Sequence, residues 1–180
     1  MKDMMIDIET LGSGPNSVIV SIGAVMFDIK SSGILSYRPS YSSCIIDPKE
    51  QQSLGMTIDA STVLWWLDQS KEAQNATFKG VISPFKETLE TLSNFIHTHQ
   101  PNTIWANSPS FDLVILRNAY AKAGMLVPWN YSIERDVRTL VSITKTDKVP
   151  FTGIQHSALD DCLNQIERCQ MAYKKISGVA

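Results

Sequence analysis

The sequence predicts a single α/β domain spanning residues 1–180. Three apolar, β-branched stretches come first and are separated by short turns, which favours three antiparallel strands. The rest of the chain alternates helical and extended patterns, as α/β folds do. A length of 180 residues favours one domain, and a hydrophobic fraction of 43% is enough for a sizeable core.

The first strand is predicted over residues 4–10, where apolar and β-branched residues dominate. A turn cluster at residues 12–16 separates it from a second strand over residues 17–27. A third strand is predicted over residues 34–46, with an interruption near Pro39. Together these strands predict an antiparallel meander.

Two acidic residues lie within the first strand. Asp7 and Glu9 share one face because strand side chains alternate, and they lie about 7 Å apart at the usual rise per residue. On an exposed edge strand both acids would be solvated. In a buried strand, desolvation of each carboxylate is costly, and a hard divalent cation such as Mg²⁺ or Mn²⁺ would relieve it. Taken alone, the motif leaves both readings open.

The middle of the chain carries two adjacent tryptophans. Residues 47–56 are predicted as a loop, residues 59–69 as a helix and residues 70–82 as a linking loop. Within the helix, Trp65 and Trp66 point about 100° apart, so they cannot both lie in one narrow core stripe. We expect one in the core, while the other either packs as well or lines a groove where an aromatic face stacks a nucleobase.

A third acidic residue follows a later strand. A helix opens at Ser83-Pro84 with proline at its first position, Pro101 stops it, and a short buried strand follows over residues 103–106. The next helix is predicted over residues 111–123, so Asp112 lies in its first turn. This acid either complements the helix dipole or adds a third carboxylate at the carboxyl edge of the sheet, where α/β folds bind ligands.

Residues 128–134 are predicted to be extended, and a short helix over residues 136–143 is capped by Asp136. The last helix is predicted over residues 158–176, with apolar residues on one face. These elements complete the predicted α/β domain.

A histidine and two adjacent acids lie at the start of the last helix. Ser157 and Asp160 fit a capping box, in which Asp160 reaches back to the cap. This pattern leaves Asp161 free to bind a metal ion. His156 lies in the preceding loop, and its ordinary pKa near 6.5 suits a general base at neutral pH.

Composition excludes several classes of protein. No apolar run approaches the ~18 residues of a membrane span, and no secretory signal is present, so we expect no membrane partner. Three cysteines without a C-x-x-C pair favour reduced thiols in the cytoplasm. A net charge of −2 argues against a long basic groove for nucleic acid. Any nucleic-acid site must therefore be local, with metal ions supplying positive charge.

The acidic residues and the histidine together resemble a known family. The ordered set of Asp7-x-Glu9, then Asp112 in Asn-Ser-Pro-Ser-Phe-Asp, then His156-x-x-x-x-Asp161 resembles the DEDDh branch of the DnaQ-like 3′→5′ exonucleases. All five signature positions are present in order. The Trp65-Trp66 helix and the stretch 135–140 look most like phage-type exonucleases and the poly(A)-directed ribonuclease AS.

This resemblance implies a ribonuclease H-like fold with a five-stranded mixed sheet, whose first three strands are antiparallel, and helices on both faces. It implies that Asp7, Glu9, Asp112 and Asp161 hold two divalent cations, Mg²⁺ or Mn²⁺. It also implies that His156 is the general base and that nucleoside 5′-monophosphates are released from a 3′ end.

The same resemblance suggests the substrate and partners. Thr10, Leu11 and Asn107 adjoin the ligands and are candidate contacts to the terminal nucleotide, with Trp65 as a candidate stacking residue. The expected substrate is single-stranded nucleic acid or a 3′ overhang, DNA or RNA. A homodimer is plausible because related enzymes dimerise.

Two rival functions belong to other classes. Residues 6–10 superficially resemble the opening of haloacid-dehalogenase-like phosphatases, but those usually carry Asp in place of Glu9 and lack a late His-x-x-x-x-Asp. A catalytically silent nucleic-acid-binding module on the same fold would be expected to lack a ligand, and none is missing here.

Overall fold

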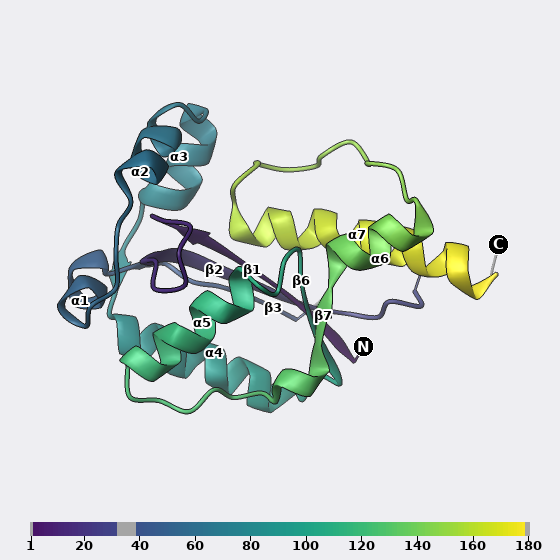
Figure 1. Ribbon diagram of the computed structural model, residues 1–180, viewed down its shortest axis with the longest axis horizontal. Helices are drawn as coiled ribbons and strands as arrows, with labels where there is room; N and C mark the ends of the chain where they lie inside the picture. The colour runs from purple at the N-terminus through teal and green to yellow at the C-terminus, as the bar shows by residue number, and fades with distance from the viewer. Residues whose placement is uncertain (1, 32–38, 179–180) are drawn as a thin grey trace.

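The computed structural model describes residues 2–31 and 39–178, and its centre is a five-stranded mixed sheet. Its strands are β1 (Asp3–Thr10), β2 (Ile19–Phe27), β3 (Ser40–Ser42), β6 (Thr103–Ala106) and β7 (Glu134–Asp136). Their order is β3-β2-β1-β6-β7 (Figure 1). Strand β2 pairs in antiparallel fashion with both β1 and β3, whereas β6 pairs in parallel with both β1 and β7. The predicted sheet is confirmed.

Helices cover both faces of this sheet, with α7 and α6 on one face and α4 and α5 on the other (Figure 1). The helices, in chain order, are α1 (Pro48–Ser53), α2 (Ala60–Leu67), α3 (Lys71–Phe78), α4 (Phe85–His99), α5 (Asp112–Lys122), α6 (Val137–Thr144) and α7 (Ala158–Ser177), with a 3₁₀ turn at Tyr131–Ile133. None of the helices in the described ranges is long and apolar enough to span a membrane.

The alternation of β1 divides its residues between two cores. Met4, Ile6 and Ile8 pack into the larger core under α4 and α5. Met5 packs into the second core, beneath α6 and α7. The odd-numbered residues Asp7 and Glu9 therefore face the α7 side, as the two-residue period of a strand requires. Because β1 and β6 are parallel, the segment that follows β6 lies at the same edge of the sheet as the carboxyl end of β1.

Two stretches predicted as loops contain helices, so those predictions are wrong. Within 47–56, the Asp47 side chain caps α1, Pro48 occupies its first position and Gln51 anchors it through hydrogen bonds to both backbone groups of Ile19. Within 70–82, Ser70 caps α3. Both helices are short and mostly polar, and tertiary contacts rather than an apolar stripe hold them.

The prediction of one long third strand is also wrong. Its residues 32–38 lie outside the described residues. The rest forms β3 and then β4 (Ile45–Ile46), which leaves the main sheet and pairs in parallel with β5 (Ile82–Ser83). The helix expected at Ser83-Pro84 begins at Phe85, with Pro84 as its N-cap. Within the stretch 128–134, which was predicted to be extended, residues 131–133 form the 3₁₀ turn, and β7 begins directly after it at Glu134.

A glycine in β2 allows α7 to approach the sheet closely. Gly23 pairs with Asp7, and a Cβ added there would lie 2.5 Å from backbone atoms of Ala158. We expect Gly23→Ala to destabilise the protein by about 1–3 kcal/mol, because backbone cannot move aside as a side chain does. Thermal unfolding measures this effect. Gly14→Ala is the matched control, since nothing lies within 4 Å of its added Cβ; an equal change in both variants would contradict the prediction.

Candidate active site

Four carboxylates from three parts of the chain meet at one cavity of about 390 Å³. Asp7 and Glu9 come from β1, Asp112 from the first residue of α5 and Asp161 from the first turn of α7. The first three are buried and Asp161 is half-buried. Of the two interpretations that the sequence left open for Asp112, the structure supports a carboxylate at the carboxyl edge of the sheet.

Burial and mutual repulsion disfavour the charged forms of these acids. Burial, followed by the neighbouring acids, raises the pKa of Asp7 well above its ordinary value and that of Glu9 to about 8. Burial raises the pKa of both Asp112 and Asp161 to about 6, against the lowering effect of backbone hydrogen bonds. Divalent cations relieve such crowding, so the chemistry of this cluster suits metal binding.

These pKa values predict that stability of the metal-free protein falls as pH rises. Folded Asp7 and Glu9 hold protons that the unfolded chain has already lost, so each further rise in pH favours unfolding until the folded pKa is passed. The burial-lowered pKa of His156 acts in the opposite sense, but only below about 6.5. Comparing pH 6.5 with pH 8 therefore isolates the carboxylates.

We expect the Tm in a chelator to be lower at pH 8 than at pH 6.5. If the free energy of unfolding falls by about 2 kcal/mol between these pH values, the Tm of a domain of this size falls by roughly 4–8 °C. Glu9→Gln should reduce this difference, because an amide does not titrate. A metal-free protein that is more stable at pH 8 would contradict the origin of these shifts.

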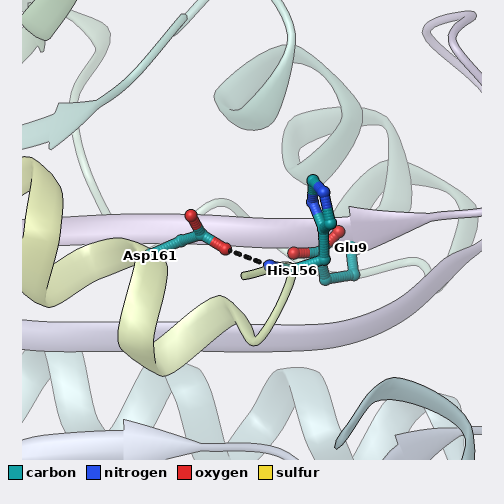
Figure 2. Close-up of side chains that lie close together, drawn as sticks. All are labelled: Glu9, His156 and Asp161. Carbon is teal, nitrogen blue, oxygen red and sulfur yellow. Dashed lines mark hydrogen bonds between the residues drawn. The ribbon is translucent and has the colours of Figure 1, made fainter. Parts of the chain in front are cut away.

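His156 lies beside Glu9 and Asp161, as Figure 2 shows. A ring nitrogen and one oxygen of each acid lie within 4.8 Å of one another. The backbone N–H of His156 donates to Asp161 Oδ2 at 2.9 Å (the dashed line in Figure 2). His156 has φ of +65°, a left-handed conformation that is uncommon outside glycine. The turn and the carboxylate thus fix the position of this loop histidine.

The predicted capping box at the start of α7 is wrong. Ser157 is the N-cap, but its side chain makes no capping hydrogen bond. Asp160 accepts instead from the backbone N–H of Ile154, on the loop before the helix. Asp161 is not free of protein partners either, since it holds His156. The two adjacent acids still have different roles, because each fixes a different part of the loop.

The two tryptophans of α2 divide as expected, with one buried and one exposed. Trp66 is 3% exposed, and its Nε1 donates to the carbonyl of Thr10. Trp65 is 44% exposed, and its ring centroid lies 4.9 Å from that of His156 in an edge-on arrangement. The nucleobase-stacking role of Trp65 stays a prediction, and its position next to the histidine is compatible with it.

The other predicted substrate contacts do not all line the cavity of the acids. Asn107 lines the carboxylate cavity. Leu11 lines a neighbouring apolar cavity of about 450 Å³ together with Trp66. Thr10 lines neither cavity, and its buried hydroxyl donates to the carbonyl of Gly12.

Two cavity residues were missed at the sequence level. Gln165 Nε2 donates to Asp7 Oδ1 at 2.7 Å, although the two residues are 158 positions apart. Arg138 lines the cavity, and its charge lowers the pKa of Asp112. In the sequence, Arg138 stood out only as part of the stretch 135–140 that carries the family resemblance, and nothing marked Gln165.

The arrangement can be compared with known proteins. The family described as "3'-5' exoribonuclease Rv2179c-like domain" matches residues 2–173. The chain belongs to this family. An exodeoxyribonuclease of Enterobacteria phage T4 is 26% identical over 215 residues, covering 99% of this chain and 92% of the relative. The family identifies the chain as a 3′-5′ exonuclease, and both similarities favour a nuclease over the rival phosphatase.

A solved structure shows the same fold. The nuclease domain of 3'hExo, a DEDDh family member bound to rAMP, superimposes with a TM-score of 0.61 at 12% identity, covering 98% of this chain and 92% of that chain. The ribonuclease H-like fold that the sequence resemblance implied is therefore confirmed.

Proposed function

We propose that this exonuclease is metal-dependent and hydrolyses the last phosphodiester bond at a 3′ end, releasing a nucleoside 5′-monophosphate. The observation that carries the proposal is the convergence of Asp7, Glu9, Asp112 and Asp161 on one cavity beside His156. All five are proposed to be catalytic, the four acids as metal ligands and the histidine as general base. One domain, residues 1–180, would contain the whole machinery.

The donor set suits two divalent cations. Four oxygen-bearing side chains with raised carboxyl pKa values favour hard ions such as Mg²⁺ or Mn²⁺ over soft ones. When bound, such ions neutralise the acids, polarise a phosphate and lower the pKa of water. Gln165 would hold Asp7 in place for this task through its hydrogen bond.

His156 would accept the proton of the attacking water. A new P–O bond forms as that proton moves to the imidazole, and the bond from phosphorus to the 3′ oxygen of the preceding nucleotide breaks. The leaving oxygen keeps the electron pair and takes a proton from water to become a 3′-hydroxyl. Burial lowers the pKa of His156, so its ring is neutral and able to accept a proton at pH 7. Its backbone bond to Asp161 keeps the ring close to the acids.

The substrate would be single-stranded nucleic acid or a 3′ overhang. The names of the relatives point to both polymers, since the family is exoribonucleolytic and the phage enzyme is an exodeoxyribonuclease. The rAMP in the structural neighbour adds weight to ribonucleotides. The expected homodimer and cytoplasmic location are part of the same proposal, and sedimentation of the purified protein tests the dimer.

The direct experiment incubates the protein with matched single-stranded RNA and DNA in Mg²⁺, in Mn²⁺ and in EDTA. We expect 5′-monophosphates to appear from the 3′ end with either ion and none in EDTA. Activity that persists in EDTA, or products bearing a 3′ phosphate, would refute the proposed chemistry.

A further inference from the structure

A second, polar cavity adjoins the site of the carboxylates. It has a volume of about 240 Å³ and lies along α7 and the loop that precedes it. Asn107, Asp161 and Gln165 line both cavities, so the two are neighbours. Lys148 and Arg168 line only the second one. A group bound there would lie directly beside whatever occupies the proposed metal site.

Unpartnered polar atoms are concentrated at this cavity. Within residues 2–31 and 39–178, three buried side-chain atoms have no protein hydrogen-bond partner, and they are Asn107 Oδ1, Gln165 Oε1 and Arg168 Nε. All three residues line the second cavity. A buried polar group without a partner is costly, so their convergence points to a ligand that satisfies them.

The orientation of Gln165 is fixed. Its side chain is 7% exposed, and its Nε2 donates to Asp7 Oδ1. An ionised Asp7, the form that would bind a cation, only accepts hydrogen bonds, so the amide oxygen of Gln165 cannot take the place of Nε2. The oxygen Oε1 is therefore left to accept a hydrogen bond. It requires an N–H or O–H donor, which a phosphate diester does not have.

The two cationic residues of this cavity, Arg168 and Lys148, favour an anionic ligand. Arg168 is half-buried and makes no ion pair with any carboxylate in the described part of the chain, and Lys148 is exposed at the same cavity. Guanidinium and ammonium groups bind phosphate oxygens well. The cavity thus suits a ligand with both a hydroxyl donor and a phosphate. At 240 Å³ it is smaller than the roughly 300–1,000 Å³ of drug-sized sites, so it suits only part of a nucleotide.

We propose that this cavity binds the ribose and the 5′ phosphate of the penultimate nucleotide of an RNA substrate. Its 2′-hydroxyl would donate to the Gln165 or Asn107 carbonyl, and its phosphate would lie against Arg168 and Lys148. The inference rests on the proposed function. In 3′→5′ hydrolysis, the terminal nucleotide has no further phosphate beyond the scissile one. The only neighbouring phosphate therefore belongs to the penultimate nucleotide, whose ribose also carries the leaving 3′ oxygen.

The first test uses the wild-type protein with Mn²⁺ and RNA oligonucleotides that carry one 2′-deoxy nucleotide. A deoxy group at the penultimate position should lower kcat/KM for the first cleavage about tenfold, the effect of one lost hydrogen bond. The same change at the third nucleotide from the end is the matched control and should have little effect. Equal cleavage of the penultimate-deoxy and all-ribo oligonucleotides would overturn the inference.

The second test concerns the phosphate. Arg168→Gln should raise KM for RNA about tenfold and change kcat by less than about twofold. The proposed contact to the phosphate is made equally in the bound substrate and in the transition state, so its loss weakens binding without slowing the chemical step. Lys174→Gln, an exposed change of the same charge on α7, is the control. An uncharged methylphosphonate 5′ to the penultimate nucleotide should raise the KM of the wild type. In Arg168→Gln the same modification should raise KM by a smaller factor, because only Lys148 is left to contact that phosphate.

These experiments separate the two proposals. A wild-type protein that cleaves no oligonucleotide refutes the proposed function and with it this inference. If the wild-type protein cleaves RNA, but the effects on KM of the methylphosphonate and of Arg168→Gln are simply additive, this inference is overturned and the proposed function stands. If Arg168→Gln does not fold, Lys148→Gln is combined with the methylphosphonate oligonucleotide in the same way, because Lys148 is exposed.

Discussion

Asp7→Asn is expected to reduce exonuclease turnover by about 10³-fold or more, the scale of losing a main electrostatic contribution to a transition state. Asp7 lies at the centre of the carboxylate cluster, and Asp112, Glu9 and Asp161 all raise its pKa. A neutral amide at this position removes an anionic ligand that a hard cation requires. The measurement is release of labelled mononucleotide from a 3′-labelled oligonucleotide in Mn²⁺.

The same substitution should not destabilise the metal-free protein. It replaces a buried carboxyl group, whose charged form burial and the neighbouring acids disfavour, with a neutral amide, and the amide oxygen can still accept the hydrogen bond from Gln165. We therefore expect the Tm in EDTA to stay level or rise, while the stabilisation given by Mn²⁺ shrinks. Asp68→Asn is the matched control, because Asp68 is exposed and lies outside the cavity. Retained trimming activity in Asp7→Asn would rule out the proposed metal site.

The site could be predicted from the sequence where local periodicity determines geometry. The two-residue period of β1 places Asp7 and Glu9 on one face, and the strand-to-helix turn after β6 places Asp112 at the sheet edge. The resemblance to DEDDh nucleases then linked these acids to His156 and Asp161. Each of these inferences depends on a local pattern or on an ordered motif.

What the sequence could not reveal depends on contacts between distant residues. The hydrogen bond from Gln165 to Asp7 joins α7 to β1, and neither residue shows a local sign of it. The capping-box pattern of Ser157 and Asp160 was misleading because the carboxylate had a competing partner in the backbone of Ile154. Helix α3 was missed because only Ala73 and Thr77 of its residues are buried, which is too few for an apolar stripe.

His156→Asn is expected to lower kcat by about 10²–10⁴-fold, the usual contribution of a general base. Asparagine tolerates the positive φ at this position better than alanine does, so it separates loss of the ring from backbone strain. The backbone N–H that donates to Asp161 is present in both His156→Asn and His156→Ala. A larger loss of stability in the alanine variant would report the strain alone.

Metal affinity decides what the histidine does. Its ring nitrogen lies close enough to oxygens of Glu9 and Asp161 to share a cation with them, so the geometry allows a ligand as well as a base. For a general base, Mn²⁺ binding measured by calorimetry should be nearly the same in His156→Asn as in the wild type, while turnover falls. If Mn²⁺ affinity falls in proportion to turnover, His156 is a metal ligand and the proton must go to another acceptor. The loss should also shrink with decreasing pH, because a wild-type imidazole whose pKa lies below 6.5 becomes protonated and stops accepting protons there.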